Sequence, residues 1–338
     1  MSLGFGLLSA QLRPGETDWS RAYEETIQLA VDAERLGLSS VWTTEHHFVD
    51  DGYMPSLAVV SGAIAAATSS IEIGTGVILA PLHHPLRLAE DAATVSLLSG
   101  GRFTLGLGLG WIGLEFEGLG AAMTERGAAM EEILTILPRA WEGLPFAHQG
   151  RVYRFPELAV RPSPSKRIPI LIGGGAEAAI RRAARLADGI YSNASQKRFL
   201  QQLEWIQDEC DRIGRDPADL RIIHYSVILP GSSAEDAWAR YTDHLWHMTW
   251  KYGDMEASAT RPGPPPPAPE LTQENRGDLL RRATIAGSSD EIVSALLDLR
   301  EQAVMPVEFV ARSHFTTLSY EAQVELMQQL AEEVAPRL

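Results

Sequence analysis

The chain has 338 residues, 45% of them hydrophobic, which is enough to bury one large α/β domain or two smaller ones. Lys and Arg number 29 against 44 Asp and Glu, and the resulting formal charge of −15 excludes non-specific binding to nucleic acid or to an anionic membrane. No basic leader precedes a long apolar core, and no apolar run could span a bilayer, so a cytoplasmic protein is expected. The single cysteine, Cys210, is expected to be structural.

Short apolar runs typical of buried strands alternate along the chain with helical segments. In chain order the predicted strands are 3–9, 40–44, 71–79, 102–110, 168–174, 190–193, 221–229 and 307–315. The predicted helices are 19–36, 55–68, 85–99, 124–143, 176–187, 196–213, 236–253, 288–303 and 319–335. Strands that are apolar on both faces are typical of a parallel sheet covered by helices.

Eight such units predict a TIM (β/α)8 barrel, formed as one domain over residues 1–338 with insertions at about 145–167 and 230–283. A doubly wound sheet is the alternative, but it usually has fewer strands, and no glycine-rich dinucleotide turn follows the first strand. Residues 148–167 are predicted to form short strands and turns. The proline-rich segment 253–277, between the seventh strand and its helix, is predicted to be a mobile lid or a disordered loop.

Polar residues at the carboxyl ends of barrel strands are the candidates for chemistry. The second strand ends in Glu45, His46 and His47, which could bind a metal, transfer protons or fill a polar loop. In an extended segment His47 points away from His46, so it is expected to be structural.

Two glycine patterns suggest a cofactor. The run Gly173, Gly174, Gly175 and Ala176 leads from the fifth strand into a helix, where backbone N–H groups favour a phosphate. Glycines also remove side chains from the third and fourth strands, which either admits a flat ring, with Trp111 at its border, or reflects internal packing. These glycines are Gly74, Gly76, Gly106, Gly108 and Gly110.

With these motifs the chain resembles the bacterial luciferase-like flavin-dependent oxidoreductases. The matching stretches are VWTTEHHF (41–48), IEIGTGVILAPLHHP (71–85), SGGRFTLGLGLGW with EFEGLG (99–120), RVYRF with VRPSP (151–164), IPILIGGGAEAAIRRAARLADG (168–189) and the tail 287–315. The resemblance implies a TIM barrel that binds FMN or the deazaflavin F420, with a reduced flavin supplied by a separate NAD(P)H reductase and, in FMN members, used to activate oxygen.

Carried over residue by residue, the resemblance makes His46 and Glu45 catalytic and places an often-cis peptide behind the flavin at Gly76–Val77. It puts the phosphate on Gly174, Gly175 and Ala176, after Gly173, and the flavin beside Ser192 and Asn193. The luciferase arginine that binds phosphate is replaced here by Leu109, and Gly and Ala replace its Ser and Thr around the phosphate. Light emission is therefore not expected.

An FMN-dependent monooxygenase acting on a small organic substrate is the favoured function, ahead of an F420-dependent dehydrogenase. The alternatives from other classes are a metal-dependent hydrolase and a flavin-binding protein without turnover. The expected substrate pocket is aromatic and draws on Trp111, His224, Tyr225, Trp246 and Trp250. Such barrels often pair through their early helices, so a homodimer is expected, although no surface stripe in this sequence demands it. No bound metal is expected.

Overall fold

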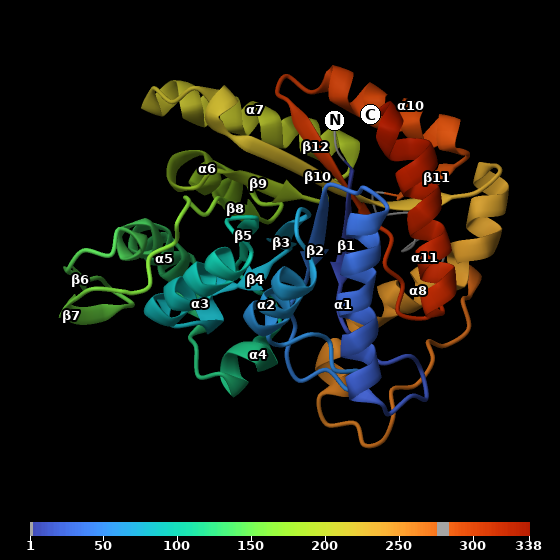
Figure 1. Cartoon of the computed structure of the whole chain (residues 1–338), viewed down its shortest axis with the longest axis horizontal. Helices are drawn as coiled ribbons and strands as arrows, with labels where there is room; N and C mark the ends of the chain where they lie inside the picture. The colour runs from blue at the N-terminus through green and yellow to red at the C-terminus, as the bar shows by residue number, and fades with distance from the viewer. Residues whose placement is uncertain (1–2, 276–283) are drawn as a thin grey trace.

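The computed structural model describes residues 3–275 and 284–338, and its centre is a closed barrel of eight parallel strands (Figure 1). Each strand pairs with the next, and the last pairs with the first, which confirms the predicted TIM barrel. In barrel order the strands are β1 (Leu3–Leu8), β2 (Ser40–Thr43), β3 (Glu72–Thr75), β5 (Phe103–Gly108), β8 (Ile170–Gly173), β9 (Gly189–Ser192), β10 (Arg221–Pro230) and β12 (Val307–Arg312).

Two short strands modify this pattern. The predicted strand 71–79 is divided into β3 and β4 (Ile78–Leu79) by a cis peptide bond between Gly76 and Val77, at the place that the family resemblance implied. Strand β11 (Thr284–Gly287) was not predicted from the sequence; it pairs with the carboxyl end of β10 and extends the sheet outside the closed ring.

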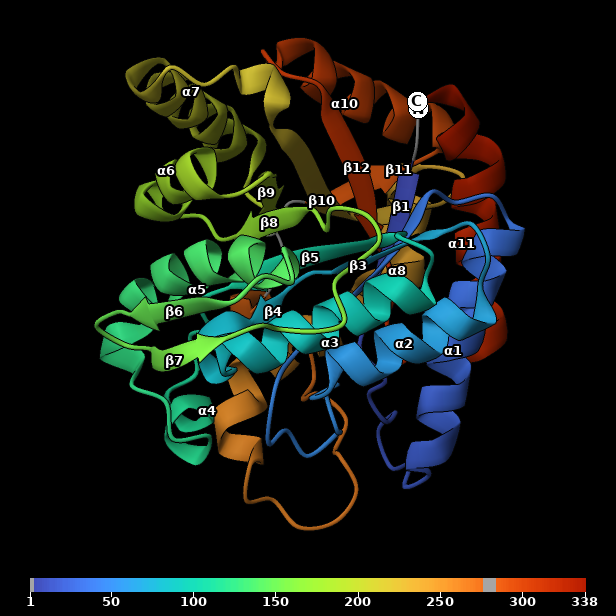
Figure 2. The same ribbon diagram turned by 60° about the vertical axis from the view of Figure 1, so that its left-hand side comes forward.

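Helices cover the outside of the barrel in both views (Figures 1 and 2). The predicted helices correspond to α1 (Trp19–Arg35), α2 (Leu57–Ala67), α3 (Pro85–Leu98), α5 (Arg126–Trp141), α6 (Glu177–Leu186), α7 (Gln196–Ile213), α8 (Ala234–Ser258), α10 (Ser289–Gln302) and α11 (Tyr320–Gln329). The short helix α4 (Gly113–Gly118) was missed. No helix of the described residues is long and apolar enough to cross a membrane.

The interior of the barrel is filled by side chains from many strands. Its buried cluster consists of Leu7, Trp42, Leu171, Tyr191, Ile223 and Val310, with Val77 and Tyr225 partly buried at its border. Tyr191 stacks between Trp42 and Tyr225, with 4.4 Å between ring centroids on each side. Since these large rings need room, small residues are required on the strands beside them.

The two predicted insertions are ordered differently. The first contains an antiparallel hairpin of β6 (Phe146–Gln149) and β7 (Arg154–Leu158), as expected for short strands and turns. In the second, α8 continues to Ser258, so the first residues of segment 253–277 are helical, which corrects the prediction. The described part beyond α8 makes defined contacts: the Pro265 carbonyl accepts from the Gly15 N–H at 2.9 Å, and the Pro269 carbonyl from Trp246 Nε1 at 2.7 Å. Residues 276 and 277 lie outside the described residues.

Candidate active site

The candidate site lies at the carboxyl ends of the strands, where TIM barrels carry their chemistry. The loop after β2, helix α4 and helix α8 gather at this end of the barrel in both views (Figures 1 and 2). The sequence between β2 and α2 contributes His46, and α4 contributes a carboxylate that sequence reasoning did not identify. This end therefore joins residues that are far apart in the chain.

His46 is buried and paired with Glu115 of α4. Its Nδ1 lies 3.0 Å from Glu115 Oε1, which also accepts the backbone N–H of His47 at 2.9 Å. Because Oε1 is an acceptor, Nδ1 must carry the hydrogen, and Nε2 is left with a lone pair. Nε2 makes no hydrogen bond in the described part of the chain, so this nitrogen is available to take up and return a proton.

Glu45 makes no hydrogen bond to His46; its carboxylate binds other groups. Glu45 is 1% exposed, and its Oε1 accepts from His47 Nε2 at 3.1 Å and from His83 Nε2 at 2.9 Å, while Oε2 accepts from the Leu79 N–H. Burial alone would raise the pKa of Glu45, but the hydrogen bonds from His47 and His83 outweigh burial and lower it to about 2. Glu45 thus fixes the loop after β4, and the two adjacent imidazoles have different partners: His47 binds Glu45, and His46 binds Glu115.

Aromatic rings enclose the imidazole of His46. Tyr53 and Tyr252 present edge-on contacts at 4.8 Å and 5.7 Å between ring centroids, and the two hydroxyl oxygens are 2.9 Å apart. Trp111 lies at 6.1 Å and is 54% exposed, so it stands at the rim. Tyr53, Tyr252 and Trp111 thus surround His46 with aromatic rings, and Tyr252, which was not among the predicted pocket residues, is the residue of α8 that faces it.

Three of the predicted pocket residues are placed elsewhere. His224 is turned to the outside of the barrel, because its neighbours Ile223 and Tyr225 face inward; its nitrogens bond to the Ala194 carbonyl and the Ser226 hydroxyl. The prediction for His224 is therefore wrong. The contacts of Trp246 and Trp250 are with residues other than His46: Trp246 donates to the Pro269 carbonyl, and Trp250 packs with His247 and Lys251.

The glycine turn after β8 is open and rich in N–H donors. Gly174 has φ +140°, a conformation that favours glycine, and α6 starts without a side-chain cap at Ala176. A Cβ added to Gly175 would meet only Gln202 Nε2, at 3.9 Å. This Nε2 is buried without a hydrogen-bond partner, while Gln202 Oε1 accepts from Ser192 at 2.6 Å.

A buried amide donor without an acceptor, next to exposed backbone N–H groups, fits the phosphate of a flavin nucleotide. Two cations near this turn are engaged with acids, Arg181 with Glu177 and Arg182 with Glu131. The exposed Arg198 is not: it donates to the Gly175 carbonyl at 3.2 Å and to Gln201 Oε1 at 2.6 Å. Ser192 is buried beside the turn, and Asn193 is exposed. Gln202 was missed from the sequence because it lies on the next helix, α7.

The glycines of the third and fourth barrel strands do not leave empty space. A Cβ on Gly74 would meet the Trp42 ring at 2.4 Å, on Gly76 the Tyr191 ring at 2.7 Å, and on Gly106 the Thr75 carbonyl at 1.9 Å. Internal packing therefore explains these glycines, and a cleared slot for a ring is not what they provide. Their direct contact with a flavin stays a prediction.

Val77 occupies the space that the remaining glycines leave. Its methyl groups lie 2.4 Å from the Cβ position of Gly108 and 2.7 Å from that of Gly173, and the side chain itself is partly exposed. Gly110 makes room for Phe116 at 2.9 Å and has φ +74°. The isopropyl group of Val77 is thus the surface on which a flat ring at this mouth can rest.

No group of three or more His, Cys, Asp or Glu side chains suited to a metal ion occurs in residues 3–275 and 284–338.

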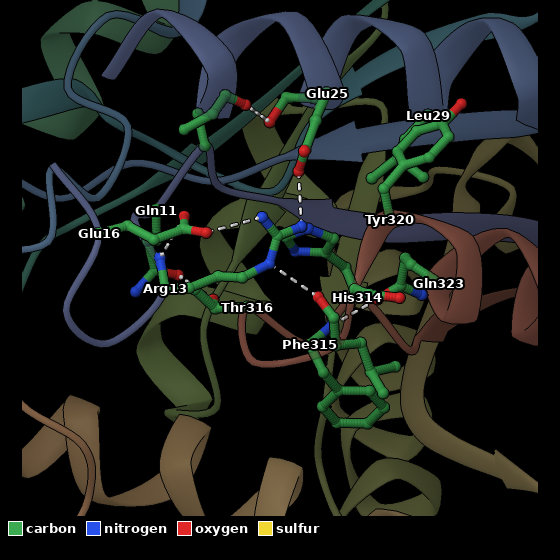
Figure 3. Close-up of a pocket in the computed structure, with 15 residues that line it drawn as sticks. Gln11, Arg13, Glu16, Glu25, Leu29, His314, Phe315, Thr316, Tyr320 and Gln323 are labelled. Carbon is green, nitrogen blue, oxygen red and sulfur yellow. Dashed lines mark hydrogen bonds and ion pairs between the residues drawn. The ribbon is translucent and has the colours of Figure 1, made fainter. Parts of the chain in front are cut away.

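A small hollow at the mouth of the barrel lies between α1 and the loop after β12 (Figure 3). Arg13 lines this hollow and forms ion pairs with Glu16 at 3.3 Å and Glu25 at 2.6 Å. Its cation is already neutralised by these acids.

Comparison with known proteins places this geometry in context. The chain is 28% identical over 323 residues to 4-hydroxyprotoasukamycin monooxygenase of Streptomyces nodosus subsp. asukaensis, covering 88% of this chain and 82% of that protein. It is 31% identical over 144 residues to the oxygenase component of flavin-dependent trigonelline monooxygenase of Acinetobacter baylyi, covering 42% of this chain and only 40% of the relative. An F420-dependent glucose-6-phosphate dehydrogenase of Segniliparus rotundus is 24% identical over 351 residues, covering 100% and 98%.

Solved structures share the fold. Monooxygenase RslO1 from Streptomyces bottropensis superposes with a TM-score of 0.83 at 23% identity, covering 99% of both chains. The oxygenating constituent of 3,6-diketocamphane monooxygenase from Pseudomonas putida, in complex with FMN, gives 0.75 at 20% identity, covering 100% of this chain and 99% of that one. The sequence pattern of the luciferase-like monooxygenases matches residues 3–305, so the chain belongs to this family of flavin- or deazaflavin-dependent oxidoreductases.

Proposed function

We propose that the protein is the oxygenase component of a two-component monooxygenase, which uses reduced FMN from a separate NAD(P)H reductase and O2 to oxidise a small organic substrate. The observation that carries this proposal is the buried His46–Glu115 pair with a free Nε2 at the barrel mouth. Relatives named as monooxygenases and as an oxygenase component support it. When bound, the reduced flavin supplies the electrons that activate oxygen.

The residues present fit FMN at its phosphate end and its ring end. The N–H groups of Gly174, Gly175 and Ala176 and the Nε2 donor of Gln202 would hold the phosphate. Gly173 leads into this turn. The ring would rest on Val77, which lies between β3 and β4 and packs against the ends of β5 and β8. The buried Ser192 and the exposed Asn193 would lie beside the ring.

His46 is placed to control a proton in the reaction. Its free Nε2 can take up or return a proton, and Glu115 fixes the ring and stabilises the imidazolium when it forms. Tyr53, Tyr252 and Trp111 limit the access of water to this nitrogen. Control of the proton and of water is what separates transfer of oxygen to a substrate from loss of hydrogen peroxide.

The variants His46→Ala and Glu115→Gln test this role. Anaerobically reduced FMN bound to each protein is mixed with O2, and the delay between oxygen consumption and peroxide release is measured. We expect His46→Ala to shorten the delay about tenfold or more and Glu115→Gln to shorten it less, with FMN affinity unchanged. Glu117→Gln, an exposed site on the same helix, serves as the control. An unchanged delay in His46→Ala with normal FMN binding would show that His46 does not handle the proton.

An F420-dependent dehydrogenase is the second candidate, because a relative with that name aligns over the whole chain. Both cofactors present a flat ring and a phosphate, so the site can be compared directly with each. Quenching of intrinsic fluorescence on titration with FMN and with F420 decides between them. Tighter binding of F420 would replace the monooxygenase proposal with hydride transfer.

We also propose that the protein forms a homodimer through α2 and α3. Both helices expose large apolar side chains: Val59 is 73% exposed, Leu97 40% and Leu98 56%. The small residue Gly62 lies beside Leu98, with 3.6 Å between its Cβ position and the leucine Cδ1. A glycine beside these exposed apolar side chains would let the helices of two subunits approach closely. Exposed apolar patches of this kind often mark subunit contacts.

A further inference from the structure

Arg312, the last residue of β12, is a buried cation for which the described part of the chain offers no acidic partner. It pairs in register with Gly6 of β1 and is 6% exposed. Among the described residues, no carboxylate lies within ion-pair distance of its guanidinium, and no acceptor receives a hydrogen bond from it. Its recorded contact is with the Tyr252 ring, whose centroid lies 5.1 Å from Cζ.

Two cations near Arg312, Lys251 and Arg13, are paired with acids. Lys251 is 2% exposed and binds Asp50, with Asp254 at 3.4 Å and Asp51 at 3.8 Å. Arg13 in Figure 3 lies between two glutamates. Arg312 therefore differs from its neighbours in having its charge uncompensated.

An uncompensated buried charge is costly, and buried arginines are normally paired. The contact with Tyr252 offsets only part of this cost, because a cation–π contact contributes about 0.5–2 kcal/mol. Arginine does not lose its proton in proteins, so it cannot escape the cost by becoming neutral. A charge held in this way fits an anion that arrives with a ligand.

The position of Arg312 connects it to the proposed catalytic histidine. The Tyr252 ring contacts the guanidinium on one side and the His46 ring on the other, the latter at 5.7 Å. Arg312 also borders a hollow of about 20 Å³, lined in addition by the polar side chains Ser9, Gln11, Tyr53, His247 and Thr316. This hollow has room for about one water, so a larger ligand must displace the partly exposed side chains Met248 and Tyr252 of α8.

We propose that Arg312 binds the carboxylate, or another planar oxyanion, of the substrate and thereby directs the rest of the substrate toward His46. The planar fork of a guanidinium binds a carboxylate through two parallel hydrogen bonds, which fixes orientation as well as position. The phosphate of the cofactor is assigned to the turn after β8, three strands away along the barrel, so it does not compete for Arg312. The direction toward His46 rests on the proposed function; the anion site itself does not.

The test uses benzoate and its neutral isostere benzamide as probes, titrated calorimetrically into the FMN-loaded protein and into the protein without FMN. We expect the unmodified chain to bind benzoate more tightly than benzamide. Arg312→Met should weaken benzoate by about 10-fold to 100-fold and leave benzamide within about twofold, with Arg312→Lys in between. Arg240→Met, which removes an exposed arginine of α8, is the matched control and should behave as the unmodified chain.

Three results would overturn the inference. Equal binding of the two probes, or no binding of either, would show that the site does not select anions. If Arg312→Met weakens the binding of FMN as well as that of benzoate, Arg312 binds the cofactor and not the substrate. A thermal midpoint well below that of Arg240→Met would make Arg312 structural. Failure of the proposed function is recognised separately, by the peroxide delay in His46→Ala, and leaves the probe preference intact.

Discussion

Glu45 is buried at the centre of a charge cluster, and replacing it with glutamine tests whether this cluster stabilises the barrel mouth. The carboxylate accepts hydrogen bonds from His47, His83 and the Leu79 backbone. Glutamine has nearly the same shape, but it presents one neutral oxygen and an NH2 group that cannot accept these hydrogen bonds. The change therefore removes the charge and half of the acceptors without leaving a cavity.

The magnitude follows from the acidity of Glu45. Burial alone would raise its pKa, but the two histidines lower it from 4.5 to about 2. At 1.36 kcal/mol for each pKa unit, the ionised form is favoured by about 3 kcal/mol in the folded protein. Glu45→Gln is expected to lower the free energy of unfolding by about this amount.

The dependence on pH has two limits. Because the pKa of Glu45 is lowered on folding, its contribution is fully present above 4.5 and is lost as pH falls toward 2. Burial lowers the pKa of His83, but the hydrogen bond to Glu45 outweighs burial and raises it above 6.5, so the His83 contribution is full below 6.5 and is lost as pH rises through its folded value. The pair therefore stabilises the fold most between 4.5 and 6.5.

Urea-induced unfolding of the unmodified chain and of Glu45→Gln at about pH 5.5 and about pH 3 measures this difference. We expect about 3 kcal/mol at the higher pH and clearly less at the lower one, where the carboxyl is already protonated in the unfolded chain while it stays mostly ionised in the folded one. Glu117→Gln, at an exposed glutamate, should change neither value by more than about 0.5 kcal/mol. A loss below about 1 kcal/mol at pH 5.5, or an equal loss at both pH values, would refute the stabilising role of the ionised carboxylate.

Two further predictions concern the cofactor and the assembly. Gln202→Leu should weaken FMN binding about tenfold in a fluorescence titration, because it removes the buried donor beside the glycine turn, while Gln207→Leu, at a partly exposed glutamine of the same helix, should not; equal affinities would remove Gln202 from the phosphate site. Leu98→Glu should convert the proposed dimer into monomers in sedimentation experiments, and Leu144→Glu, at a leucine outside α2 and α3, should not; a monomeric unmodified chain would refute the dimer.

The barrel could be predicted from the sequence because its strands are short apolar runs, and the segments between them carry apolar residues with the spacing of an α-helix. The cis peptide bond that divides residues 71–79 could not be predicted from the apolar pattern, because the residues on both sides of it are typical of a strand. The family resemblance indicated its position at Gly76–Val77. Helix α8 was predicted to end at Gly253, but it continues to Ser258, because contacts made by the folded chain outweigh the low helix propensity of a single glycine. Tertiary contacts of this kind leave no local pattern.

The site was predicted only where its residues lie next to a strand end. His46 follows β2 directly, but its partner Glu115 is 69 positions away and stands in a stretch, GLEFEG, whose only local signal is an acid between two large apolar residues. Gln202 and Arg312 carry no signal of their own in the sequence, because what distinguishes them is a buried donor without an acceptor in Gln202 and a buried cation without a described acidic partner in Arg312. That property exists only after the chain has folded.

The loop after β2 owes its placement to contacts with several other parts of the barrel. Glu45 binds His83 of the loop after β4, His46 binds Glu115 of α4, and Asp50 binds Lys251 of α8, so three βα segments hold one short run. Proton transfer needs its donor and acceptor placed within a few tenths of an ångström, which a single loop on the surface cannot guarantee. Charge pairs to separate segments provide this rigidity, and they explain why the run carries more ionisable residues than the one histidine proposed to handle the proton. The acids and the second histidine position the loop, and His46 is left with one free nitrogen.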